Sequence, residues 1–102
     1  MTEEKNNPLQ IELTPEVADG VYANLAIIAH SSSEFVIDFV SVMPGMSKAN
    51  VKSRLIMTPE HAKRLLGALQ DNIAKYEAHF GQIRITGPET GIPPVMGFGG
   101  DA

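Results

Sequence analysis

Apolar and polar residues alternate in four stretches of the chain, and this alternation predicts four β-strands. The first covers residues 9–13, and because it is short we expect it to lie at an edge of the sheet. The second and third cover residues 21–30 and 34–43, and three serines join them in a connection of hairpin length. The fourth, residues 49–57, follows a Pro-Gly turn. Because the turns are short, we expect the strands to form an antiparallel meander.

The strand register can be predicted from the faces that the apolar residues would share. Pairing Ala29 with Phe35 brings the odd-numbered apolar residues of the second and third strands to one face of the sheet. Reflection about the Pro-Gly turn then sets Asp38 opposite Arg54. A cross-strand ion pair explains this carboxylate in an apolar strand better than a catalytic acid does.

One long helix is predicted after the last strand. Thr58 offers a side-chain cap, Pro59 is tolerated in the first turn, and Gly81 supplies a stop. Spacings of three and four residues place one apolar stripe along the helix: Ala62, Leu66, Leu69, Ile73, Tyr76 and Phe80. We expect this stripe to pack against the sheet face that carries Leu25, Ile27, Ile37, Phe39 and Leu55. The predicted fold class is α+β, an antiparallel four-stranded β-meander followed by one long C-terminal helix.

The 102 residues fit a single domain, because a second hydrophobic core would leave too few apolar residues for either. We expect a flexible N-terminus over residues 1–8 and a single sheet-plus-helix domain over residues 9–86. Residues 87–102 are rich in glycine and proline, and this composition predicts a flexible tail.

Composition narrows the classes of function. The chain has no cysteine, which excludes disulfides, thiolate nucleophiles and Cys-based zinc sites. No apolar run approaches the roughly 18 residues of a membrane span, and the N-terminus lacks the pattern of a signal peptide, so we expect a cytoplasmic protein without a membrane partner. A net charge of −4 opposes a general attraction to nucleic acid.

Residues that would support catalysis are scattered. His30, His61 and His79 have no spacing that would place two of them on one helical turn as metal ligands. The serines beside His30 fit a turn, and no nucleophile elbow accompanies them. We therefore expect no enzyme activity, no catalytic or metal-ligating residue and no cofactor.

Two sets of residues are candidates for binding. Five of the eight basic residues form a possible basic patch: Lys48, Lys52, Arg54, Lys63 and Arg64. Aromatic residues that would stack on bases are not interleaved with them. The second set is predicted to form the sheet face that a single helix leaves uncovered, and hence an oligomer or partner interface: Tyr22, Ala26, Ile28, Val36, Val40, Val42 and Ile56.

Three blocks of sequence resemble a known family. Pro-Glu-Val-Ala-Asp-Gly-Val-Tyr-Ala-Asn at residues 15–24, Ser-Glu-Phe-Val-Ile-Asp-Phe at 33–39 and Thr-Pro-Glu-His-Ala-Lys at 58–63 resemble the short bacterial proteins of domain-of-unknown-function family 3467. The resemblance implies a bacterial source and a strand-rich domain that ends in a helix. The order of elements and the stretch at 17–22 are also similar in layout to the export chaperone SecB, whose family forms oligomers that hold unfolded chains.

The expected function is that of a non-catalytic bacterial protein-interaction or assembly module that forms homo-oligomers and binds a protein partner. A SecB-like holdase that binds unfolded polypeptides is the alternative. A nucleic-acid-associated protein that uses the basic residues between Lys48 and Arg64 is the third. A holdase must leave an apolar groove open after assembly, whereas an assembly module closes its apolar surface.

Overall fold

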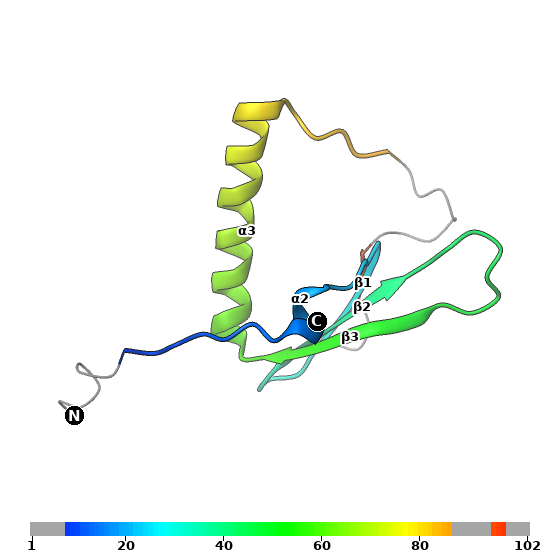
Figure 1. Cartoon of the computed structure of the whole chain (residues 1–102), viewed down its shortest axis with the longest axis horizontal. Coiled ribbons are helices and arrows are strands. Elements are labelled where there is room, and N and C mark those ends of the chain that lie inside the picture. The colour runs from blue at the N-terminus through cyan, green and yellow to red at the C-terminus, as the bar shows by residue number, and fades with distance from the viewer. Residues whose placement is uncertain (1–7, 87–94, 98–102) are drawn as a thin grey trace.

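The structure is a computed structural model that describes residues 8–86 and, as backbone, residues 95–97. The elements follow in the order α2 (Pro15–Ala18), β1 (Leu25–His30), β2 (Phe35–Ser41), β3 (Asn50–Met57), α3 (Pro59–Phe80) and β4 (Val95–Gly97). The sheet has the strand order β3-β2-β1-β4, and α3 stands apart from it (Figure 1). An α+β fold with a long helix after the antiparallel strands is confirmed.

The predicted four-stranded antiparallel meander is wrong in its first strand. Residues 9–13 form no strand, and Leu9 and Ile11 have 87% and 90% of their surface exposed. The antiparallel part of the sheet is three-stranded, β1 with β2 and β2 with β3. The short strand β4 joins β1 in parallel. Alternation alone does not produce a strand, because its backbone groups also need a neighbouring strand as a partner.

The two terminal segments are described only in small part. Residues 1–7 of the predicted flexible N-terminus lie outside the described residues. Of the predicted tail at 87–102, the structure describes β4, which pairs Ala26 with Val95 and Ile28 with Gly97. The remainder of that segment lies outside the described residues, so the flexible tail stays a prediction.

The register of the first hairpin differs from the prediction by one residue. Ala29 pairs with Val36, and His30 pairs with Phe35. The turn explains the shift, because the Ser31 amide donates to the Glu34 carbonyl at 2.9 Å and closes a turn of two residues. The Ser31 hydroxyl also accepts hydrogen bonds from the amides of residues 33 and 34, at 3.1 and 3.3 Å. A shift of one residue exchanges the side chains of the neighbouring strand with which each side chain shares a face of the sheet.

The pairing of β2 with β3 follows the prediction. Asp38 lies opposite Arg54, and the guanidinium donates to both carboxylate oxygens, at 2.7 Å from Nε and 2.9 Å from the second nitrogen. Between these strands Phe39 pairs with Ser53 and Val40 with Val51, so Lys52 is the extra residue of a β-bulge. Bulges raise the local twist of a strand and interrupt pairing at a sheet edge.

Asn24 extends the pairing of β1 with β2 by one step. Its side-chain amide donates to the carbonyl oxygen of Val42, and its side-chain oxygen accepts from the Val42 amide, both at 2.8 Å. Its backbone amide donates to the carbonyl of Val40 at 3.0 Å. The Asn24 side chain thus replaces a peptide group, and it fixes the point at which the chain enters the sheet.

Helix α3 has the predicted ends but not the predicted packing. The Thr58 hydroxyl accepts from the His61 amide at 3.1 Å, and the Gly81 amide donates to the Glu77 carbonyl. The stripe is not packed on the sheet: Leu66 and Leu69 are 55% and 54% exposed. Thr58 alone separates β3 from α3, so no loop exists that would return the helix across the sheet (Figure 1). The expected helix-on-sheet core is therefore wrong for the single chain.

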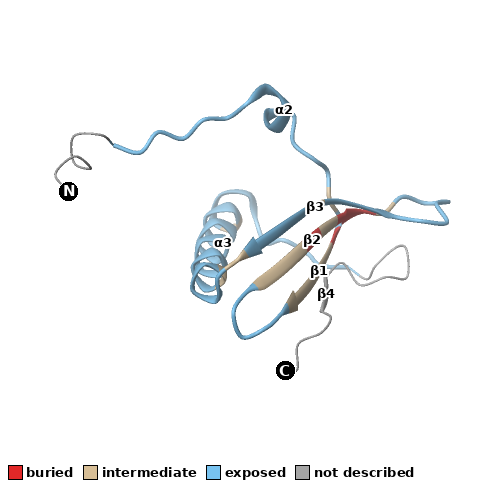
Figure 2. Cartoon of the chain, turned by 90° about the horizontal axis from the view of Figure 1, so that it is seen from below, coloured by how far each residue is buried: buried red, intermediate tan, exposed pale blue. Residues whose placement is uncertain are grey.

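The core of the described residues is small. Leu25 is 8% exposed and Val40 is 3% exposed, and these two neighbours across β1 and β2 are the buried apolar residues (Figure 2). By contrast, 19 large apolar residues of the described chain are exposed. Large apolar side chains lie mostly inside folded proteins, so the single chain leaves much of its apolar surface without cover.

Candidate protein-interaction surface

The observed register gives the sheet two faces. The Asp38 face is formed by the residues that share a side with Asp38: Leu25, Ile27, Ala29, Val36, Val40, Arg54 and Ile56. The Phe39 face is formed by the residues that share a side with Phe39: Ala26, Ile28, His30, Phe35, Ile37, Ser53, Leu55 and Met57. Both faces are rich in apolar residues, so neither is a typical solvated face.

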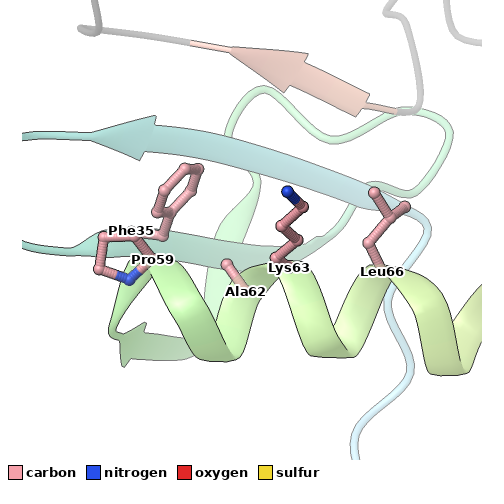
Figure 3. Close-up of a pocket in the computed structure, with 5 residues that line it drawn as sticks. All are labelled: Phe35, Pro59, Ala62, Lys63 and Leu66. Carbon is pink, nitrogen blue, oxygen red and sulfur yellow. The ribbon is translucent and has the colours of Figure 1, made fainter.

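A groove of about 330 Å³ lies between the Phe39 face and the start of α3. Phe35 contributes the sheet side of its lining, and Pro59, Ala62, Lys63 and Leu66 contribute the helix side (Figure 3). The groove is open, and its lining is apolar apart from Lys63. The sheet and the helix stripe therefore form two apolar sides of one wedge, which we call the helix–sheet wedge.

The helix side of the wedge continues along α3. Ile73, Tyr76 and Phe80 are 39%, 50% and 69% exposed, and the rings of Tyr76 and Phe80 lie 5.0 Å apart. Exposed aromatic side chains are enriched at protein interfaces, where each ring buries a large area with few rotatable bonds. The stripe thus has the composition of a contact surface, not of a solvated helix face.

The predicted interface residues do not share one face. Ala26 and Ile28 lie on the Phe39 face, whereas Val36, Val40 and Ile56 lie on the Asp38 face. The shifted hairpin register is the cause of this division. Among these residues Val40 is buried inside the chain at 3% exposure, so it is not available to a partner.

The two remaining residues of the predicted interface flank the strands. Tyr22 precedes β1 and is 71% exposed, and Val42 follows β2 and is half-buried. The helix stripe was not predicted as an interaction surface, because its spacing is equally that of a helix face buried in a core. The direct connection from Met57 through Thr58 to Pro59 was the signal that could have identified it.

Two of the five residues of the predicted basic patch form ion pairs. Arg54 is paired with Asp38, and Arg64 forms an ion pair with Glu60 one helical turn away. Lys63 lines the wedge, and Lys52 lines a second groove between β3 and the turn after α2. These contacts divide the basic residues among separate surroundings, so the structure does not favour a continuous phosphate-binding surface.

The Asp38–Arg54 pair shifts the pKa values of both partners. Hydrogen bonds from Arg54 lower the pKa of the Asp38 carboxyl below its usual 3.8, and burial partly opposes this effect. The same hydrogen bonds raise the pKa of Arg54. Asp38 has only 9% of its surface exposed, and the paired geometry accounts for a charged residue at that depth.

We expect this pair to make the stability of the protein depend on pH in the acid range. A carboxylate whose folded pKa is lowered contributes stability above its unfolded pKa, and it loses that contribution as the pH falls through the folded pKa. The urea concentration at the midpoint of unfolding should therefore decrease as the pH is lowered from 7 to a value below 3.8. The fall should be smaller in Asp38→Asn, and an equal fall in both proteins would contradict this role.

Within residues 8–86, no three His, Asp or Glu side chains gather into a potential metal site. His30 stacks on Phe35 with ring centres 5.4 Å apart, and His79 meets Phe80 edge-on at 4.6 Å. None of the helices in this part of the chain has both the length and the apolar composition that a bilayer span requires.

The chain is thus a small α+β protein with a sheet that has apolar residues on both faces and a helix whose apolar stripe is exposed. The chain belongs to the family described as "Protein of unknown function (DUF3467)", whose model matches residues 1–85. The resemblance noted from the sequence is therefore confirmed. No curated protein and no solved structure matches the chain. The similarity in layout to SecB is not supported by these comparisons.

Proposed function

We propose that this protein is a non-catalytic assembly module that associates with further copies of itself through the helix–sheet wedge. The observation that carries the proposal is the exposure of the α3 stripe, where Leu66, Leu69 and Phe80 are all more than half exposed. A helix with one apolar stripe gains most of its stability by packing that stripe against another surface. The one-residue connection at Thr58 prevents α3 from packing on the sheet of its own chain.

A second copy supplies the missing surface with the correct chemistry. Each chain offers an apolar stripe and an apolar Phe39 face, so a two-fold arrangement would let each stripe meet the sheet or stripe of its partner. The exposed side chains of the stripe alone present on the order of 500 Å² per chain, at roughly 100 Å² each. Two chains would then bury about 1,000 Å² from the stripes, which is close to the minimum for a specific interface before the sheets are counted.

Mass in solution tests the proposal. Light scattering at micromolar concentration should give a multiple of the 11.0 kDa chain mass. Leu69→Lys places a charge in the centre of the stripe and should shift the mass toward that of one chain, because an unpaired buried charge costs several kcal/mol. Ala78→Lys, on the far side of α3, is the matched control and should leave the mass unchanged. A mass of one chain for the unmodified protein would overturn the proposal.

The holdase alternative predicts a different result from the same material. An assembly that leaves the stripe open would suppress the aggregation of an unrelated unfolded protein, and Leu69→Lys would abolish the suppression. An assembly that closes the stripe would have no such effect. We favour closure, because the stripe is apolar and exposed and the Phe39 face, apart from His30 and Ser53, is apolar as well.

A further inference from the structure

Residues 9–13 form an extended arm that has the sequence of a strand but pairs with no strand of the described residues. Leu9, Ile11 and Leu13 are 87%, 90% and 67% exposed, and the residues between them are polar. We propose that this arm adds as a further strand to the β3 edge of a second copy of the chain. The inference rests on the proposed self-association, and it concerns a separate contact from the helix–sheet wedge.

Strand β3 offers an edge that can accept the arm. It is the outermost strand in the order β3-β2-β1-β4, and no strand of the described residues pairs with its outer side. Such an edge presents unpaired amides and carbonyls, which an incoming extended segment satisfies. The bulge at Lys52 interrupts the edge near its start, so the regular stretch runs from Ser53 to Met57.

The arm and this stretch agree in length. Five residues of an extended arm span about 17 Å, and the five residues from Ser53 to Met57 span the same distance. Strand addition uses main-chain hydrogen bonds for affinity, so equal lengths allow each exposed edge group to find a partner. Alternate side chains of the arm then decide which way it faces.

Side-chain chemistry selects one orientation of the arm. If Leu9, Ile11 and Leu13 lie on the Phe39 face, they extend the apolar surface beside Leu55 and Met57. Leu55 is 42% exposed and Ile56 on the Asp38 face is 61% exposed, so both faces have apolar surface to cover and charge decides between them. Glu12 then falls on the Asp38 face with Arg54, whose side chain is 62% exposed although one side of it is paired. The opposite charges of Glu12 and Arg54 therefore favour this orientation.

The geometry directs the arm to a partner and not to its own β3. Helix α2 begins directly after the arm, and the Thr14 hydroxyl accepts from the Val17 amide at 3.4 Å. Glu16, Val17, Gly20 and Val21, in and after α2, line an open groove together with Lys52 and Ser53 at the start of β3. From this position the arm leads away from the body, and a gap separates it from β3 (Figure 2).

A spin label distinguishes a partner's edge from the arm's own edge. The chain has no cysteine, so Gln10→Cys provides a single site for a nitroxide. Labelled protein without ¹⁵N is refolded together with unlabelled ¹⁵N protein, so that only contacts between chains broaden the observed amide signals. We expect broadening of the β3 signals from Ser53 to Met57. Broadening of β3 only when label and ¹⁵N share one chain would show that the arm pairs with its own edge, and would overturn the inference.

A proline variant tests whether the main chain makes the contact. Ile11→Pro with Glu12→Pro removes a ladder donor, because adjacent amides of a strand point to opposite sides and one of the two must face β3, so it should abolish the β3 broadening and weaken self-association by about tenfold or more. Ile11→Ala with Glu12→Ala is the control, because it removes both side chains but keeps both amides, and its broadening should persist.

The two proposals fail in different ways. If light scattering shows an oligomer and the mixed sample shows no β3 broadening, the arm contact is wrong while self-association through the wedge stands. If the mass is that of one chain, self-association is wrong and the arm contact fails with it.

Discussion

Replacing Leu66 and Ile73 together by glutamate should leave the chain without a cooperative unfolding transition. Both residues belong to the α3 stripe, and the described part of a single chain buries only Leu25 and Val40 among its apolar residues. A core of that size does not offset the conformational entropy that folding removes. If partner chains complete the core, separating them removes most of the folding free energy. Far-ultraviolet circular dichroism during heating measures the loss.

The unmodified protein should also depend on its partner chains for stability, so its melting temperature should decrease when the protein is diluted. For a dimer that unfolds as it dissociates, each tenfold dilution lowers the free energy of unfolding by about 1.4 kcal/mol, which corresponds to roughly 5 °C in melting temperature for a chain of this size. Ala74→Glu with Ala78→Glu, on the far side of α3, should retain the transition. A melting temperature that is constant over a hundredfold dilution would show that one chain is stable alone.

The features that the sequence predicts well are those controlled by neighbouring residues. Thr58 and Gly81 mark both ends of α3, because a hydroxyl cap and a stop at glycine act within one turn. The register of β2 with β3 follows from Asp38 and Arg54, since a misaligned pair would leave a carboxylate without a partner in an apolar strand. In both cases the deciding interaction is polar and specific.

The first hairpin shows why an apolar pattern can mislead. Leu25 fits equally well opposite Phe39 or opposite Val40, because nearly every side chain on both strands is apolar. Hydrophobicity therefore does not distinguish two registers that differ by one residue. The Ser31 hydroxyl decides between them by accepting hydrogen bonds from two amides of the turn. The predicted interface was divided between two faces for this reason.

The position of α3 depends on a geometric fact that periodicity does not contain. A stripe with spacings of three and four residues predicts a buried helix face, but it does not identify the surface that buries it. The stripe would contain the same apolar residues whether it packs on the sheet of its own chain or on the surface of another chain. The one-residue connection between β3 and α3 excludes the first, and it is visible in the sequence as Met57-Thr58-Pro59.

Leu25→Ala should destabilise the protein by roughly 2–5 kcal/mol, as truncations of buried leucines do. Leu25 is 8% exposed and lies opposite Val40, which is 3% exposed, so its removal leaves a cavity in the centre of the small core. Asn24 holds the adjoining backbone to Val42 through two hydrogen bonds of 2.8 Å, which limits the collapse of strand β1 into that cavity. Urea unfolding at one fixed protein concentration measures the change without the effect of dilution.

Ile85→Ala is the matched control for this core substitution, because Ile85 is 89% exposed and lies beyond the end of α3. Its free energy of unfolding should stay within about 0.5 kcal/mol of the unmodified protein. The mass of Leu25→Ala by light scattering should remain that of the unmodified assembly, since Leu25 lies inside one chain and not at the helix–sheet wedge. An effect of Leu25→Ala as small as that of the control would show that the contact between β1 and β2 contributes little, and that stability resides almost wholly in the contacts between chains.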